Sequence, residues 1–173
     1  KKDLVVSVIQ VNAQNDLEEN LLKSYQLLSS VDASCDLIVF PEAFLMRGNA
    51  QEQLSAVFDD SNEVIKSFSS WAQERNSWLV SGTVNEREGK RVYSTSYLFN
   101  PQGEVKAKYR KIHLFHARLK DRVIDERMIY SSGSKPITVE IEGWVFGFGI
   151  CYDLRFPEIF RDYATQGVDA ILL

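Results

Sequence analysis

Hydrophobic and polar residues change their spacing along this chain, and each change marks the border between a predicted strand and a predicted helix. Short apolar stretches at residues 3–11, 35–40 and 78–86 indicate strands. Apolar side chains recur every three or four positions in residues 15–31 and 61–76, which indicates helices. The first helix would bury one face formed by Leu17, Leu21, Leu22, Tyr25 and Leu28, and the second would bury Val64, Ile65, Phe68, Trp71 and Ala72.

The middle of the chain is patterned as antiparallel strands joined by turns. Gly89 and Lys90 predict a hairpin turn before a strand at 91–100, and the turn at 100–103 leads into a strand at 104–111. Residues 112–136 carry no clear pattern.

The end of the chain returns to alternating strands and helix. Strands at 137–141 and 144–150 flank a turn at 142–143, a helix follows at 157–166, and a strand at 168–173 comes last. Strand–helix units at both ends, with hairpins between them, indicate an α/β layered domain with a mixed sheet.

Length and charge narrow the class of protein. The 173 residues suffice for one domain with a substantial core, and a formal net charge of −4 without a basic block argues against a nucleic-acid partner. No apolar run approaches the length of a membrane span, and residues 1–11 are interpreted as a strand rather than a signal peptide. We therefore expect a cytoplasmic protein without a membrane partner.

The last residue, Leu173, lies inside an apolar strand without a polar tail. Because chain termini normally lie at the surface, we interpret residues 1–173 as the first part of a longer domain.

Two cysteines are present, Cys35 and Cys151, and both are expected to be reduced thiols. We expect no metal site, because His113 and His116 lie near neither cysteine in sequence and no CxxC pair occurs.

Three reactive side chains follow predicted strands directly, where the active sites of α/β sheets gather: Glu42, Lys111 and Cys151. Taken singly, each has an ordinary interpretation, a buried thiol or a solvated charge. Taken together they predict acyl transfer through a thioester. We expect a helix N-terminus and Lys111 to lower the pKa of the Cys151 thiol, Glu42 to act as general base, and the backbone N–H of Tyr152 to face the oxyanion together with Lys111.

Three short motifs resemble those of the nitrilase, or carbon–nitrogen hydrolase, superfamily. They are "FPEAF" with Glu42, "YRKIHLF" with Lys111 and "GICYDLRFPE" with Cys151, in the family's order. The resemblance implies a four-layer α-β-β-α sandwich with mixed sheets, usually assembled as a homodimer or a higher homo-oligomer. It also implies a Glu–Lys–Cys triad that works without a metal or an organic cofactor.

Many members of that superfamily carry a second glutamate, seven residues before a glycine. Glu126 and Gly133 have this spacing here, so the resemblance implies that Glu126 helps to position Lys111. The surrounding stretch departs from the family pattern, with His116 in place of an aspartate and no glycines in "ARLKDRVID". This stretch is expected to border the acyl pocket.

The residues after Cys151 are expected to support the turn that presents it. Arg155 and Glu158 are predicted to form an ion pair that fixes this turn, with contact to a substrate carboxylate as a second possibility for Arg155, and Asp153 is predicted to help hold the turn. His113 is expected to pack with a backbone hydrogen bond, and Cys35 to be a buried thiol.

Within the superfamily the chain looks most like the omega-amidase and deaminated-glutathione amidase type. That likeness implies hydrolysis of a terminal amide on a small carboxylate substrate, with release of ammonia. The motifs leave open a nitrilase, an aliphatic amidase or an N-carbamoylase on the same fold. Two further alternatives are an ammonia-supplying glutaminase domain of a larger synthetase and a catalytically inactive binding or scaffold domain.

Overall fold

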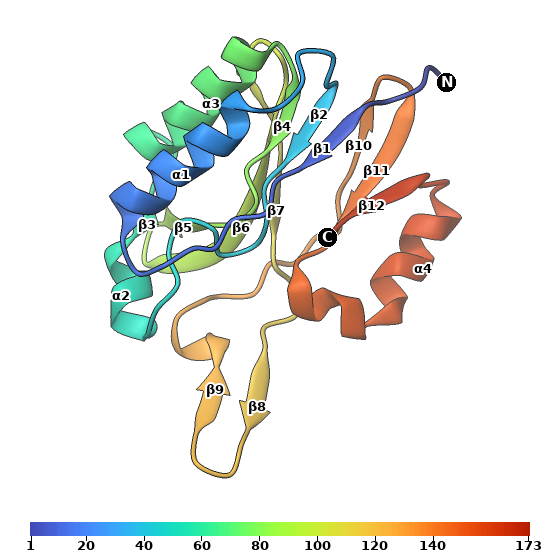
Figure 1. The fold of residues 1–173 in the computed structure, drawn as a ribbon. Coiled ribbons are helices and arrows are strands. Elements are labelled where there is room, and N and C mark those ends of the chain that lie inside the picture. The colour runs from blue at the N-terminus through green and yellow to red at the C-terminus, as the bar shows by residue number, and fades with distance from the viewer.

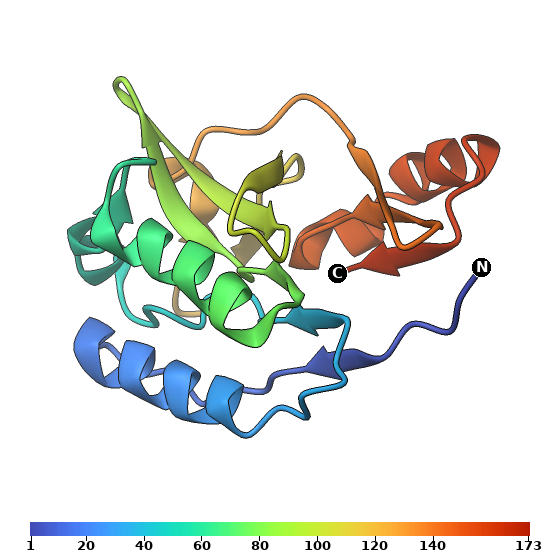
Figure 2. The same cartoon turned by 90° about the horizontal axis from the view of Figure 1, so that it is seen from above.

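Two sheets packed face to face, with helices on their outer sides, form the core of a computed structural model that describes residues 1–173 (Figures 1 and 2). Helices α1 (Leu17–Ser29) and α3 (Glu63–Arg75) cover the seven-stranded sheet, and α4 (Pro157–Thr165) covers the three-stranded one. The expected four-layer α-β-β-α sandwich is therefore present.

The first sheet is mixed, as predicted. Its strands lie in the order β1-β2-β4-β6-β5-β3, and β7 pairs with β6. The parallel pairs β1–β2, β2–β4 and β3–β5 accompany a β6 strand that is antiparallel to its three partners. The bounds are β1 Val6–Val8, β2 Leu37–Val39, β3 Val57–Phe58, β4 Trp78–Val80, β5 Val84–Glu88, β6 Arg91–Phe99 and β7 Val105–Arg110.

The second sheet has the order β10-β11-β12, with bounds Thr138–Ile141, Trp144–Phe148 and Ala170–Leu172. Apolar side chains of both sheets and of α4 form one core, which includes Leu98, Tyr109, Phe148 and Tyr163. A Cβ atom on Gly147 would lie only 2.8 Å from the ring of Tyr163, so the glycine allows α4 to pack close against β11.

Helix α3 begins and ends as the sequence predicts. Asn62 caps its first turn by accepting a hydrogen bond from Val64 N, and Asn76 ends it with φ of +47°. Its predicted apolar face is buried except for Val64, which is partly buried.

Helix α1 differs from its predicted face, because Leu22 and Tyr25 are exposed. The buried positions include Asn20 and Ser24, and the Asn20 amide donates to the carbonyl oxygens of Gln14 and Leu45. A buried asparagine whose hydrogen bonds are all made inside the protein substitutes here for an apolar residue.

The turns of the hairpins are also where the sequence predicts them. Gly89 and Gly143 have positive φ, and Gly103 N donates to Asn100 O at 2.8 Å. The single strand predicted at 78–86 is instead two strands, because Gly82 interrupts it with φ of +66°.

Several elements have no counterpart in the prediction. Residues 112–136 contain a hairpin of β8 (His116–Arg118) and β9 (Val123–Asp125), which projects from the sandwich in Figure 1, and a 3-10 turn at Glu126–Met128. The short strand β3 was not predicted either. Nor was α2 (Ala50–Ser55), whose capping box joins Asn49 to Glu52.

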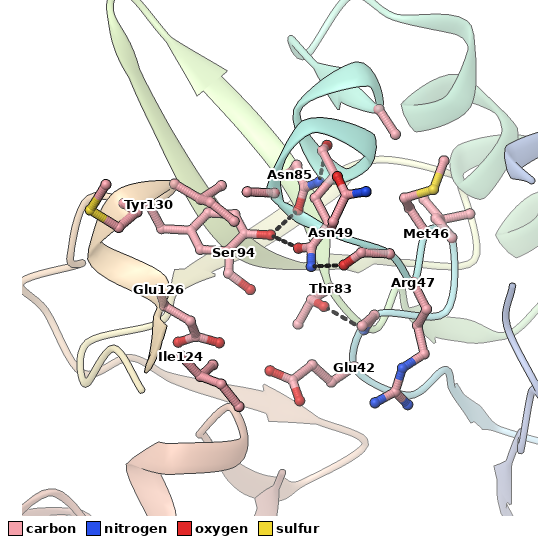
Figure 3. Close-up of a pocket in the computed structure, with 18 of the residues that line it drawn as sticks. Glu42, Met46, Arg47, Asn49, Thr83, Asn85, Ser94, Ile124, Glu126 and Tyr130 are labelled. Atoms are coloured by element: carbon pink, nitrogen blue, oxygen red, sulfur yellow. Dashed lines mark hydrogen bonds between the residues drawn. The ribbon is translucent and has the colours of Figure 1, made fainter. Parts of the chain in front are cut away.

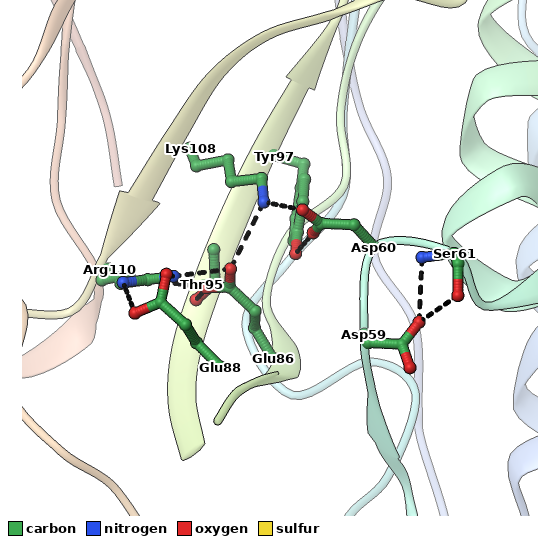
Figure 4. A network of polar contacts seen from close by, with 9 residues as sticks. All are labelled: Asp59, Asp60, Ser61, Glu86, Glu88, Thr95, Tyr97, Lys108 and Arg110. Atoms are coloured by element: carbon green, nitrogen blue, oxygen red, sulfur yellow. Dashed lines mark hydrogen bonds and ion pairs between the residues drawn. The ribbon is translucent and has the colours of Figure 1, made fainter. Parts of the chain in front are cut away.

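A buried carboxylate, Glu86, joins the three strands β5, β6 and β7 (Figure 4). It accepts hydrogen bonds from Arg110 Nη2 at 2.8 Å, Arg110 Nε at 2.8 Å and Thr95 Oγ1 at 2.6 Å, and Lys108 Nζ lies 3.4 Å away. Burial alone would raise the pKa of Glu86, but the contacts with Arg110 and Thr95 outweigh it and lower that pKa.

None of the helices combines the length and the apolar character that crossing a membrane requires.

Candidate active site

Lys111 lies at the centre of the site, immediately after β7. Its backbone N–H donates to Ser94 O at 2.9 Å, and its side chain is fully buried. The ammonium Nζ lies 3.1 Å from Glu42 Oε1 and 2.9 Å from Glu126 Oε1. Burial alone would lower the pKa of Lys111, but the two carboxylates outweigh it and raise that pKa, so the side chain stays charged.

Glu42 reaches Lys111 from the loop that follows β2. The next residue, Ala43, has φ of +53°, and its N–H donates to Thr83 Oγ1 at 2.8 Å. A Cβ atom on Gly82 would lie 2.1 Å from Pro41 O, so only glycine allows the strand break after β4 to approach this loop. The break in the predicted strand therefore helps to fix Glu42.

Glu126 reaches Lys111 from the opposite side, from the 3-10 turn after β9. Its Oε2 accepts a hydrogen bond from Phe115 N at 2.7 Å, which leaves Oε1 for the ammonium. Gly133 N donates to Lys111 O at 2.8 Å, and a Cβ atom on Gly133 would lie 2.1 Å from Arg110 O. The spacing of Glu126 and Gly133 thus has a physical reason, since both residues anchor one segment on Lys111.

Cys151 follows β11 and is exposed, with φ of +46°. An L-residue in this left-handed conformation is strained, and such strain is common where a reactive side chain is presented. The predicted helix begins at Pro157 as expected, but a 3-10 turn over Cys151–Arg155 lies between it and the thiol.

The expectation of a lowered pKa for the Cys151 thiol is wrong in this structure. Burial raises its pKa, and the neighbouring Glu42 carboxylate raises it further, while Lys111 opposes them with a smaller effect. The prediction considered the effects of Lys111 and of a helix N-terminus on the thiol, but it left out the effect of the negatively charged Glu42 on the same thiol.

Asp153 lies beneath Cys151 and is completely buried. Its carboxylate accepts hydrogen bonds from Ile150 N at 2.9 Å, Tyr109 Oη at 2.7 Å and His113 N at 2.9 Å. His113 Nδ1 also lies 2.7 Å from Asp153, and its ring stacks on Phe156. Asp153 therefore joins the lysine motif to the cysteine motif.

Arg155 and Glu158 lie elsewhere than expected. Both are exposed, and no ion pair joins them or involves either residue. Arg155 also lines neither of the two cavities at the site, so a contact between its side chain and a substrate is not favoured by this placement. The ring of Tyr152 packs edge-on against Phe115 and Phe156.

The remaining predicted side chains have no place in the site. Cys35 is a buried thiol that donates to Leu37 O, and burial raises its pKa. His116 lies on the projecting hairpin, 3.3 Å from Asp125.

A cavity of about 1060 Å³ opens beside Glu42 and Glu126 (Figure 3). A second, small one of about 30 Å³ is lined by Cys151, Ser96 and Phe148. Glu42 and Thr83 line both, so the two cavities are neighbours at Glu42.

Several residues that line the larger cavity escaped the sequence analysis. Tyr130 Oη lies 2.6 Å from Gln53 Oε1 and 2.8 Å from Asn85 Oδ1, which joins three distant segments across the cavity wall. Single polar residues within strands and turns carry no sequence signal of this role. The capping box that begins α2 was the one visible signal, and it identifies the helix that contributes Gln53.

Residues 5–173 match the sequence model of the carbon–nitrogen hydrolase family, and the chain belongs to this family, within the nitrilase superfamily.

Curated relatives include a 2-oxoglutaramate amidase of Bacillus subtilis (strain 168), 30% identical over 90% of this chain and 58% of the relative. A deaminated glutathione amidase of Synechocystis sp. is 29% identical over 99% of this chain and 66% of the relative. Among solved structures, Nit3 of Saccharomyces cerevisiae, a member of branch 10 of the nitrilase superfamily, superposes with a TM-score of 0.78 and 26% identity, covering 97% of this chain and 62% of Nit3. The chain thus spans roughly six tenths of the length of these relatives.

Proposed function

We propose that this carbon–nitrogen hydrolase cleaves the terminal amide of a small carboxylate-bearing substrate through a thioester on Cys151 and releases ammonia. The observation that carries the proposal is the buried Lys111 ammonium, held by Glu42 and Glu126 beside a cavity of about 1060 Å³. Relatives named as amidases support an amide as the bond cleaved.

The first step joins the thiol to the amide carbon. Because the pKa of Cys151 is raised, the resting pair is a thiol next to the Glu42 carboxylate. Glu42 takes the thiol proton as sulfur attacks the carbonyl carbon. A free thiolate therefore never forms next to the negatively charged carboxylate. The carbonyl oxygen becomes an oxyanion, which faces the Lys111 ammonium and Tyr152 N–H.

The second step breaks the carbon–nitrogen bond. Glu42 returns the proton to the leaving nitrogen, ammonia departs, and a thioester remains on Cys151. Glu42 then takes a proton from water as the water oxygen attacks the thioester carbon. The carbon–sulfur bond breaks, Glu42 gives that proton to the departing sulfur, and the acid is released from the regenerated thiol. Glu126 holds Lys111 throughout. Removal of one preorganised oxyanion donor typically costs a factor of about 10² to 10³ in kcat.

Ammonia release tests the bond specificity. The natural protein should release ammonia from the monoamides of C4 to C6 dicarboxylic acids faster than from the corresponding nitriles or from N-carbamoyl amino acids. A nitrile that outruns its amide would assign a nitrilase instead. If no compound is hydrolysed, the inactive scaffold becomes the better assignment.

The domain boundaries, the cytoplasmic location and the homodimer or larger homo-oligomer stay predictions from the sequence.

A further inference from the structure

Two arginines line the large cavity without a carboxylate partner, Arg47 and Arg122. The three acidic side chains that line it all have partners: Glu42 and Glu126 contact Lys111, and Asp125 forms an ion pair with Arg127. No acidic side chain forms an ion pair with either arginine. The only cations that line this space are therefore free to bind an anion from outside the protein.

The backbone around Arg47 is held in place. Arg47 N donates to Gln14 O at 2.9 Å, and the carbonyl of the next residue, Gly48, accepts from Gln53 Nε2 at 3.0 Å. Gln53 is held in turn by Tyr130 Oη at 2.6 Å. The guanidinium therefore extends from a fixed loop, so less freedom is lost when it binds a ligand.

The two arginines flank the reactive residues along the chain. Arg47 lies on the loop that carries Glu42, and Figure 3 shows the Glu42 and Glu126 side chains next to each other at the cavity. Arg122 lies at the turn of the β8–β9 hairpin, where its carbonyl accepts from Leu119 N, and the same strand leads to Glu126. Arg47 and Arg122 therefore share one cavity with Glu42 and Glu126, the two carboxylates that contact Lys111.

We propose that Arg47 and Arg122 bind the carboxylate of the substrate remote from the reactive amide. A carboxylate at the Lys111 end would meet the negative charges of Glu42 and Glu126, whereas a guanidinium binds a carboxylate with two parallel charge-assisted hydrogen bonds. The apolar residues that line the same cavity, which include Leu45, Met46 and Ile124, suit the methylene chain of an ω-amide of a dicarboxylic acid. This inference rests on the proposed amidase function.

The test compares two amides of equal length, glutaric acid monoamide and neutral pentanamide. The measured quantity is kcat/KM for glutaric acid monoamide divided by kcat/KM for pentanamide. In the natural protein, Arg47→Gln and Arg122→Gln should each lower this ratio, and the double variant should lower it about 10- to 100-fold. Arg47→Lys should retain part of the preference for glutaric acid monoamide over pentanamide. Arg118→Gln, on the same hairpin but outside the cavity lining, is the matched control and should keep the wild-type ratio.

Reversing the charge at position 47 adds a measurement that would not change if Arg47 had only a structural role. Arg47→Glu should raise the ratio of kcat/KM for 5-aminopentanamide over pentanamide, because the cavity then offers a carboxylate to an ammonium. An unchanged ratio in the double glutamine variant, or no gain with the ammonium substrate, would overturn the inference while leaving the amidase function intact. A wild-type protein that hydrolyses neither amide would overturn the proposed function itself.

Discussion

Cys151 and Glu42 are best understood as one reacting pair. The thiol is exposed, but burial of its surroundings and the Glu42 carboxylate keep its pKa above the ordinary value. A protonated thiol becomes nucleophilic when the neighbouring base removes its proton during attack, and it does not rely on a thiolate that is already present. Glu42 is therefore expected to matter at every proton transfer in the cycle.

The alkylation rate of Cys151 measures this state directly. With iodoacetamide, the rate constant should keep rising from pH 7 past about pH 8.5, because the raised pKa delays thiolate formation. Cys35 should react more slowly throughout, since it is only 5% exposed. Peptide mass spectrometry at several pH values gives both rates. A plateau for Cys151 below pH 7.5 would show a stabilised thiolate and contradict the raised pKa.

At the scale of elements, the segment 126–133 works as a clamp on the backbone of Lys111. Glu126 holds the ammonium and Gly133 holds the main chain, with one hydrogen bond to Lys111 O. Because Gly133 has no side chain, its main chain can lie close to Arg110 O and donate to Lys111 O.

Gly133→Ala tests the clamp. The added methyl group would overlap Arg110 O, so the segment must move and Glu126 must shift with it. We expect a loss of about 1–3 kcal/mol in the free energy of unfolding and a lower kcat for amide hydrolysis. Ser132→Ala, at the exposed neighbouring position, should change neither quantity. Urea unfolding and ammonia release provide the two readouts, and wild-type values for Gly133→Ala would contradict the account.

The elements show how far the sequence alone reaches. Strong periodicity and turn chemistry predicted α3, the three hairpin turns and the strand before Cys151. The β8–β9 hairpin escaped, because its exposed strands carry no alternation of apolar and polar residues. The motifs identified Glu42 and Lys111, and the spacing to Gly133 identified Glu126, the second carboxylate on Lys111. The opposed charges that set the pKa of Cys151 depend on distances that no sequence pattern contains.

At the scale of the molecule, the two core clusters lie on opposite faces of the first sheet, and polar groups join the strands between them. Glu86 is the most buried of the acidic side chains on the face toward α3, and its contacts join β5, β6 and β7. Strand β7, which leads to Lys111, is therefore held from the face opposite the candidate active site.

The ionised Glu86 side chain should stabilise the folded protein at neutral pH and lose this contribution in acid. Its folded-state pKa is lowered, so its contribution is present above the unfolded pKa of about 4.3 and is lost as the pH falls through the folded value. Glu86→Gln should therefore cost about 2 kcal/mol at pH 7, and the difference from wild type should shrink below about pH 4. Glu88→Gln, at an exposed partner of Arg110, should have a smaller effect. Denaturant unfolding at pH 7 and pH 3 checks both, and a cost for Glu86→Gln that is equal at the two pH values would contradict this role.

The covalent intermediate tests the central claim most directly. The natural protein, mixed with glutaric acid monoamide and quenched in acid within the first turnovers, should gain the mass of one glutaryl group on the peptide that contains Cys151, with ammonia released in step. Cys151→Ala should show neither the adduct nor ammonia release, while Cys35→Ala should show both. An adduct absent from wild type, or ammonia release that continues at the wild-type rate in Cys151→Ala, would contradict the thioester mechanism.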